Sequence, residues 1–231
     1  MHGTLSGFIK DGHRTIVPLD PILLPDIAAI HMRAKALAMI EAIVSPDWGD
    51  RYFSFNANWS EGEELASLRT GSGDDWCLLF GPFGAAIKGL AHETSLAGNK
   101  VLTAAVQSQV PNTFDSFLKE PAFGMDWLSY CYWRSPDDSS WQKVISPNSS
   151  AADIDDGSEE FLALLLEPAS SYVEFAHWYY EIEISLESVE RIYKHECLTD
   201  ELLRSLNPEL AFSEAKEFAV EIGYLSALSN N

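Results

Sequence analysis

The clearest periodic pattern in the chain lies between residues 26 and 44. Its apolar positions recur at steps of three and four, at Ile27, Ile30, Ala34, Leu37, Ile40 and Val44. This spacing puts one apolar stripe along an α-helix. Asp26 suits the N-cap position, and Pro46 predicts an end near Ser45 because the residue before a proline avoids helical backbone angles. We therefore predict an amphipathic helix that lies on a core.

Strand-like runs follow this predicted helix. Residues 51–58 alternate between aromatic and polar positions, residues 64–69 are shorter and more polar, and residues 76–80 are apolar on both faces. Residues 85–90 form a return strand after a glycine-rich turn, and residues 126–134 read as a further strand rich in aromatics. The turns between the first four runs leave no room for crossover helices, so neighbouring strands must pair antiparallel.

Helices are predicted for most of the remaining chain. Prolines bracket a short helix over residues 111–119. Residues 135–158 are rich in Ser, Pro, Asp and Asn and read as a long loop. A helix over residues 158–166 follows this loop. Later helix starts are indicated by the N-cap residues Thr199 and Ser213, and by a capping box at residues 171–174.

These elements together predict an α+β fold. Its centre is an antiparallel β-meander sheet packed against the N-terminal helix, and its C-terminal part is helical. We divide the chain into an α/β sheet portion over residues 1–149 and an acidic helical portion over residues 150–231. With 231 residues, both portions are expected to pack on one core as a single domain.

The net charge narrows the classes of partner. The chain has 35 Asp and Glu against 15 Lys and Arg, which gives a net charge of -20 at pH 7. Residues 150–231 alone hold 18 acidic and 4 basic residues. Such a charge repels nucleic acids and anionic membranes, and no apolar run approaches the ~20 residues of a membrane span. We expect neither nucleic acid nor membrane as a partner.

The cysteines and the first residues indicate the compartment. Cys77, Cys131 and Cys197 are odd in number and widely spaced, so we interpret them as reduced structural thiols rather than as disulfides or metal ligands. The first residues lack a basic segment followed by a long apolar one, so they do not read as a signal peptide. We expect a cytoplasmic location.

Two groups of residues are candidates for a protein-binding surface. The first group combines carboxylates and an indole around glycine turns: Trp59, Glu61, Glu63, Glu64, Asp74 and Asp75. The second is the aromatic pair Tyr179 and Tyr180 in the acidic helical part. Exposed aromatic residues beside carboxylates suit protein recognition. The simpler interpretation is turn chemistry for the first group and core packing for the second.

His92 and Glu93 offer an enzymatic alternative. Together with Asp74 and Arg69 they could serve a hydrolase as acid–base residues. Neighbouring side chains on an extended backbone point apart, which weakens the pair. The sequence contains no His-x3-His or HExxH metal motif, no GxSxG elbow, and no glycine-rich phosphate or dinucleotide loop. We therefore predict no metal and no cofactor.

Several short motifs stand out in the first half of the chain: Arg51-Tyr52-Phe53-Ser54-Phe55-Asn56, Trp59-Ser60-Glu61-Gly62-Glu63-Glu64, Gly71-Ser72-Gly73-Asp74 and Lys88-Gly89-Leu90-Ala91-His92-Glu93. Glu120-Pro121-Ala122-Phe123 and Glu221-Ile222-Gly223-Tyr224 add to the pattern. Together they resemble an uncharacterised family of bacterial cytosolic proteins that has no established activity. The resemblance therefore implies no catalytic residue. In being small and acidic, without enzymatic motifs, that family is similar to immunity proteins that neutralise secreted toxins.

The function predicted from the sequence is a non-enzymatic, cytosolic protein-binding module. In its most specific form this is an immunity protein that occludes a basic toxin, because an acidic surface meets a cationic partner rapidly. The predicted partner is therefore a basic protein, and the sequence leaves the oligomeric state open. The hydrolase that uses His92 and Glu93 remains the alternative.

Overall fold

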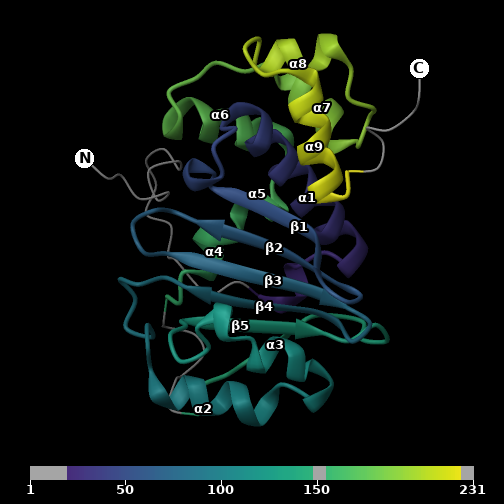
Figure 1. The fold of residues 1–231 in the computed structure, drawn as a ribbon. Helices are drawn as coiled ribbons and strands as arrows, with labels where there is room; N and C mark the ends of the chain where they lie inside the picture. The colour runs from purple at the N-terminus through teal and green to yellow at the C-terminus, as the bar shows by residue number, and fades with distance from the viewer. Residues whose placement is uncertain (1–19, 148–154, 225–231) are drawn as a thin grey trace. The chain divides into compact units, whose positions relative to one another are not determined.

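The structure is a computed structural model that describes residues 20–147 and 155–224 (Figure 1). The chain divides into two compact units, Met1–Ile27 with Ser67–Ala163, and Ala28–Ala66 with Leu164–Asn231. Within these described residues, six strands form one antiparallel sheet in the order β1-β2-β3-β4-β5-β6. This order follows the chain, so the predicted α+β fold with an antiparallel meander is confirmed. The boundary predicted between residues 149 and 150 lies outside the described residues.

The first unit contains the register that positions the candidate site. Its strands are β3 (Asp75–Gly81), β4 (Gly84–Leu90), β5 (Tyr130–Arg134) and β6 (Gln142–Lys143). In the β3–β4 hairpin the partners run from Gly81↔Gly84 beside the turn to Asp75↔Leu90 at the open end. Gly84 has φ 114°, and a Cβ there would lie 2.1 Å from the Arg134 carbonyl oxygen, so the turn requires glycine.

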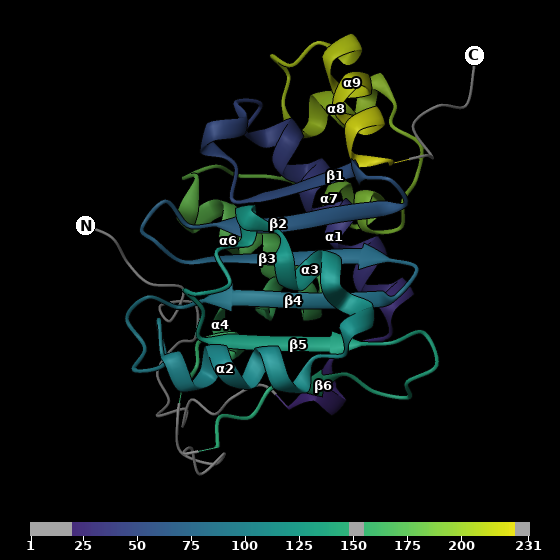
Figure 2. The ribbon, with the colours of Figure 1, turned by 60° about the horizontal axis from the view of Figure 1, so that its bottom comes forward.

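Helices cover one face of these strands. Figure 2 shows α2 (Lys100–Gln109) and α3 (Asp115–Lys119) in front of β4 and β5. Phe114, Phe117 and Phe123 are buried in this layer. The helix predicted over 111–119 is present as a 3-10 turn, Asn112–Phe114, followed by α3. The remaining helices of this unit are α4 (Ser158–Phe161) and the start of α5 (Ala163–Leu166).

The second unit combines the predicted N-terminal helix with two strands. It holds α1 (Ile27–Val44), β1 (Phe53–Ser60) and the first residues of β2 (Glu63–Arg69). The bounds of α1 agree with the predicted start after Asp26 and the predicted end near Ser45. The prediction that only one stripe of α1 is buried was wrong, however. Every residue from 34 to 43 is buried, which means that α1 is enclosed on all sides there.

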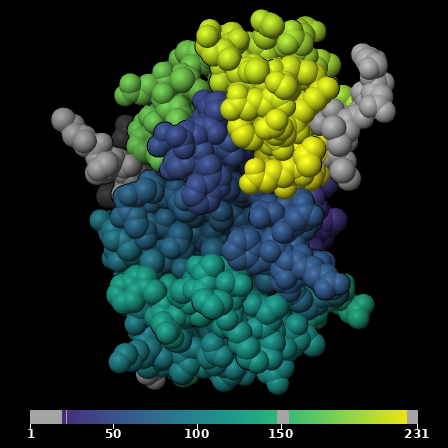
Figure 3. Space-filling model, viewed as in Figure 1, coloured from purple at the N-terminus to yellow at the C-terminus, as the bar shows by residue number. Residues whose placement is uncertain are grey.

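Four helices complete the second unit: α6 (Ala169–Tyr179), α7 (Leu186–Tyr193), α8 (Asp200–Leu206) and α9 (Phe212–Ile222). Helices α8 and α9 are visible at the surface as the yellow part of Figure 3. The predicted cap at Thr199 is confirmed, since its hydroxyl accepts a hydrogen bond from the Leu202 N–H at 3.1 Å.

Two of the predicted helix starts were wrong. Helix α6 begins at Ala169 directly after Pro168, so Ser171 lies inside the first turn and is not a cap. Proline needs no N–H partner at a helix start, which allows the earlier beginning. Helix α9 begins at Phe212, so Ser213 also lies within the helix. The helix predicted over 158–166 is divided into α4 and α5 at Leu162.

The predicted strand over 126–134 was too long at its N-terminal end. Pairing with β4 begins at Gly89↔Tyr130, and residues 126–129 form turns instead. The Leu128 carbonyl accepts a hydrogen bond from the Gly98 N–H at 3.2 Å, so this carbonyl is used by the loop and not by the ladder with β4. The strand therefore starts only at Tyr130.

A buried carboxylate joins three elements of the second unit. Glu41 of α1 is fully buried and accepts a hydrogen bond from the Tyr52 N–H at 2.8 Å. The Tyr172 hydroxyl donates to it at 2.7 Å, and the Tyr180 hydroxyl also donates to it. Burial raises the pKa of Glu41, and these hydrogen bonds act in the opposite direction. The carboxylate thus connects α1, the chain before β1, and α6.

We expect Glu41→Leu to lower the free energy of unfolding by about 2–6 kcal/mol, because the Tyr172 and Tyr180 hydroxyls lose their acceptor at about 1–3 kcal/mol each. Urea unfolding followed by circular dichroism would measure the loss. Glu174→Gln, at an exposed position of α6, should stay within about 0.5 kcal/mol of the parent.

The sharper test is a double-mutant cycle with Tyr172→Phe. In the parent this change should destabilise, whereas in Glu41→Leu it should stabilise by about 1 kcal/mol because it removes an orphaned hydroxyl. Additive effects of the two substitutions would contradict the assigned hydrogen bond.

Candidate functional site

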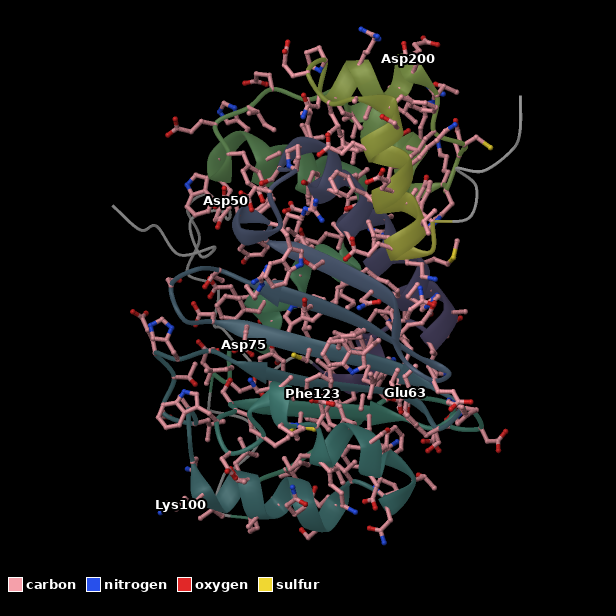
Figure 4. All side chains as sticks on the ribbon, in the orientation of Figure 1. Asp50, Glu63, Asp75, Lys100, Phe123 and Asp200 are labelled. Atoms are coloured by element: carbon pink, nitrogen blue, oxygen red, sulfur yellow. The ribbon has the colours of Figure 1, made fainter. Side chains whose placement is uncertain are left out.

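The β3–β4 hairpin brings Asp74 and His92 together. Asp74 lies just before β3, and His92 lies two residues after the end of β4. Since Asp75 pairs with Leu90, the residues immediately beyond this pair meet at the open end of the hairpin. Figure 4 labels Asp75 at this end of the sheet. The strand register therefore assembles the pair.

Asp74 and His92 form a hydrogen-bonded dyad. The Asp74 Oδ1 atom lies 2.7 Å from His92 Nδ1 and accepts a hydrogen bond from the His92 backbone N–H at 2.9 Å. Two contacts from one oxygen fix both the imidazole ring and the backbone that carries it. With Nδ1 engaged by the carboxylate, Nε2 is the ring nitrogen left for chemistry.

Hydroxyl groups hold the other carboxylate oxygen of Asp74. The Thr70 hydroxyl lies 3.2 Å from Oδ2 and the Ser72 hydroxyl lies 3.3 Å from it. The Thr70 N–H also donates to the Asp74 carbonyl at 3.1 Å, which closes the turn. Gly73 has φ 117°, a backbone region open to glycine, and it lies beside the His92 ring. The turn thus presents Asp74 in one orientation.

The environment of His92 favours its protonated form. The hydrogen bond that the His92 imidazole donates to the Asp74 carboxylate raises the pKa of His92, and the carboxylate of Glu93 acts in the same direction. Its side chain is 38% exposed while that of Asp74 is 10% exposed. The dyad therefore combines a buried carboxylate with an imidazole that solvent and ligands can reach. Such a pair can hold or transfer a proton at Nε2.

The other two members of the predicted enzymatic group are placed less closely. The Glu93 carboxylate lies 4.0 Å from His92 Nε2 and is 77% exposed. Arg69 is the last residue of β2, next to Thr70 in the chain. Of the four residues predicted for an enzymatic site, His92 and Asp74 are therefore in direct contact, and the Glu93 carboxylate lies farther from the imidazole.

The predicted first group of protein-binding residues is spread along the chain. Glu61 lies in the turn between β1 and β2 and is exposed, whereas Asp74 and Asp75 follow the far end of β2. Trp59 and Glu63 flank the first turn and are half-buried. Strand β2 itself separates the two turns, so the chain does not bring the six residues into one turn cluster.

Two carboxylates of this group are bound to buried lysines. Glu64 accepts a hydrogen bond from Lys35 Nζ at 2.9 Å and also contacts His31. Asp75 accepts one from Lys88 Nζ at 2.6 Å, and the Lys88 side chain is only 3% exposed. A buried ammonium group needs such a partner. The carboxylates of Glu64 and Asp75 therefore stabilise the fold by pairing with buried lysines.

Tyr179 and Tyr180 are only partly available at the surface. Tyr180 donates its hydroxyl to the buried Glu41, so its polar end is used within the fold. The Tyr179 ring stacks on Phe175 with centroids 5.1 Å apart. Both side chains are half-buried, whereas the neighbouring Trp178 is 40% exposed. The exposed aromatic surface here belongs mainly to Trp178.

The sequence analysis placed Asp74 and His92 in one candidate group, but it did not bring out the direct contact between them or the hydroxyls that hold Asp74. A signal for the pairing was present. Predicted strands over 76–80 and 85–90 around the turn at 81–84 already align residue 74 with residue 91.

Metal-ligand geometry and thiol ionisation are two further properties of the described part of the chain. Within residues 20–147 and 155–224 no group of three or more His, Cys, Asp and Glu side chains is arranged to hold a metal ion. Cys77, Cys131 and Cys197 are free thiols. Burial raises the pKa of Cys77 to about 12, which disfavours the reactive thiolate. Among the described helices, none is both long and apolar enough to pass through a bilayer.

We expect the imidazole of His92 to titrate above the ordinary histidine pKa of about 6.5, and Asp74→Asn to lower that pKa. The stabilisation from the charged dyad is complete below about pH 6.5 and is lost as the pH rises through the folded pKa. Two-dimensional NMR of the histidine ring nitrogens would follow the titration. Glu93→Gln should lower the pKa less, and an equal effect of both substitutions would contradict the dyad.

Comparisons of the chain with family models, with curated proteins and with solved structures give no match. The resemblance to a bacterial family therefore stays a prediction from the motifs. Any function for this chain has to be argued from the geometry and the charge of its own residues.

Proposed function

We propose that this protein is a non-enzymatic module that binds a basic protein. The carrying observation is the surface charge of residues 164–224, where every carboxylate side chain belongs to an exposed residue. That segment holds 13 Asp and Glu but only 4 Lys and Arg. The acidic residues are Glu167, Glu174, Glu181, Glu183, Glu187, Glu190, Glu196, Asp200, Glu201, Glu209, Glu214, Glu217 and Glu221.

Most of this charge is not neutralised within the second unit. Three carboxylates pair with the basic side chains of Arg191, Lys194 and Arg204, and Glu183 pairs with His177. Within the described residues, no ion pair is formed by the other nine. Glu214, Glu217 and Glu221 follow one face of α9 at spacings of three and four. Like charges this close repel, and a cationic partner would relieve the repulsion.

The most specific form of the proposal is an immunity protein in the cytoplasm. A toxin that acts on nucleic acid needs a basic surface around its site. An acidic protein meets such a surface rapidly and can compete for it. The short motifs that resemble an uncharacterised bacterial family support a bacterial setting for this role.

The test uses the product of the adjacent gene, if that gene encodes a basic protein. The two chains should co-purify at low salt, and the association rate should fall steeply as salt is added. Replacing Glu201, Glu214 and Glu217 together by Gln should slow association about tenfold with little change in stability. Lys216→Gln on α9 is the matched control and should accelerate association. Absence of binding at low salt would refute the proposal.

The Asp74–His92 dyad favours a second candidate, a hydrolase-type enzyme. Its specific support is the 2.7 Å contact between the carboxylate and Nδ1, which orients Nε2 as a proton acceptor. In this role His92 would take a proton from water or a substrate hydroxyl, and Asp74 would stabilise the imidazolium that forms. Glu93 would add negative charge near Nε2.

Hydrolysis of p-nitrophenyl acetate by the purified protein tests this second candidate. If the dyad is catalytic, His92→Gln should lower the rate by about 10²–10⁴-fold, and Asp74→Asn should lower it in the same direction. His177 is the matched control because it lies 2.7 Å from the Glu183 carboxylate at an exposed position. Equal rates for His92→Gln and His177→Gln would exclude an enzymatic role for the dyad.

A further inference from the structure

Two tryptophans are exposed on neighbouring segments of the second unit. Trp48 begins a 3-10 turn, Trp48–Asp50, and is 56% exposed. Trp178 lies in the last turn of α6 and is 40% exposed. Indole rings bury more apolar surface than most side chains when they are enclosed. Two indoles exposed on adjoining segments provide apolar surface of the kind that marks interaction sites.

Hydrogen bonds and ring contacts join the two segments. The Tyr180 hydroxyl, just after α6, lies 3.4 Å from the Asp50 carbonyl oxygen and accepts from the Tyr52 N–H at 3.2 Å. The Tyr179 ring packs edge-on against Tyr52, with centroids 5.1 Å apart. The ring centroids of Trp178 and Tyr179 are 6.2 Å apart. The end of α6 and the 3-10 turn therefore form one surface.

Contacts beneath this surface hold it in place. Tyr180 is tied to the buried Glu41, and Tyr179 stacks on Phe175, which is fully buried. In the 3-10 turn, the Asp47 side chain accepts a hydrogen bond from the Gly49 N–H at 2.8 Å. A partner would meet aromatic rings that are already positioned, which lowers the entropy lost on binding.

The charge around the tryptophans is negative. Asp47 and Asp50 flank Trp48, and Glu174 and Glu181 flank the end of α6, all of them exposed. The nearest basic residue in the chain, Arg51, is turned inward. Its guanidinium donates to the Ser45 and Pro46 carbonyls and lies 4.4 Å from the centroid of the Phe218 ring. His177, the other basic group beside Trp178, is paired with Glu183.

We propose that Trp48, Asp50, Trp178 and Tyr179 form an aromatic–acidic patch that receives arginine side chains of the basic partner. This inference rests on the proposed binding function and names its contact surface. A planar guanidinium stacks on an indole face while its N–H groups pair with a carboxylate. An ammonium group of lysine has no plane to stack and is more strongly hydrated. The patch therefore selects arginine over lysine.

Isothermal titration calorimetry with two synthetic peptides tests the selection directly. One peptide alternates arginine and serine, and the other alternates lysine and serine. The arginine peptide should bind about tenfold more tightly, a difference that corresponds to about 1.4 kcal/mol. Trp48→Ala and Trp178→Ala should each weaken arginine-peptide binding about fivefold and reduce the preference over lysine.

Conservative and remote variants keep the test decisive. Trp178→Phe retains an aromatic face and should recover part of the affinity. Trp127→Ala is the matched control, because Trp127 is 57% exposed in the other unit and should leave binding unchanged. Circular dichroism of each variant would show that the fold is kept, which is expected for exposed positions.

The outcomes separate this inference from the proposed function. If both peptides bind equally and the tryptophan variants behave like the parent, the patch is refuted. The salt-dependent binding of a basic protein, sensitive to the α9 carboxylates, would then still support the proposed function. If sedimentation shows that the parent self-associates and Trp48→Ala abolishes this, a second copy occupies the patch and the inference is overturned.

Discussion

The second unit depends on a single buried carboxylate. Glu41 has no exposed surface, and its oxygens accept hydrogen bonds from the Tyr52 N–H and from the hydroxyls of Tyr172 and Tyr180. A carboxyl group buried without such donors would destabilise the fold by several kcal/mol. Without Glu41, the buried Tyr172 hydroxyl would lose the acceptor to which it donates at 2.7 Å. This mutual requirement fixes α1, the start of β1 and the end of α6 against one another.

The hydrogen bond between Glu41 and Tyr180 also affects the surface of the unit. Because Tyr180 is held by Glu41, the backbone after α6 lies beside the 3-10 turn that carries Trp48. Trp178 is then directed outward, and Tyr179 is half-buried between the core and solvent. An interaction deep in the unit thereby determines which aromatic rings are presented to a partner. Polar groups in a core can specify geometry in this way when all of them are satisfied.

A second constraint acts at the open end of the β3–β4 hairpin. The antiparallel register places Asp74 opposite the residues that follow β4, and the Thr70 and Ser72 hydroxyls then fix its carboxylate. Either of the two candidate functions has to account for this dyad. In a binding module it is a structural clamp on the chain after β4. In an enzyme it would be the acid–base centre.

Local sequence pattern was enough to predict several elements of the fold. The bounds of α1, the four meander strands, the cap at Thr199 and the acidic surface all follow from spacing, turn residues and composition. Local signals were insufficient where two neighbouring positions could each begin a helix. Ser171 and Ser213 have good N-cap chemistry, yet the helices start earlier, at Ala169 and Phe212.

Which polar and aromatic residues remain available to a partner depends on contacts between residues that are distant in the chain. In the sequence, nothing marks the carboxylates of Glu64 and Asp75 as less available than that of Glu61. In the structure, Glu64 is bound to Lys35 and Asp75 to Lys88. Tyr180 and Trp178 are near neighbours in one aromatic run, yet one donates to a buried carboxylate and the other is exposed. Such differences arise from contacts between residues far apart in the chain, and a single sequence contains no local trace of them.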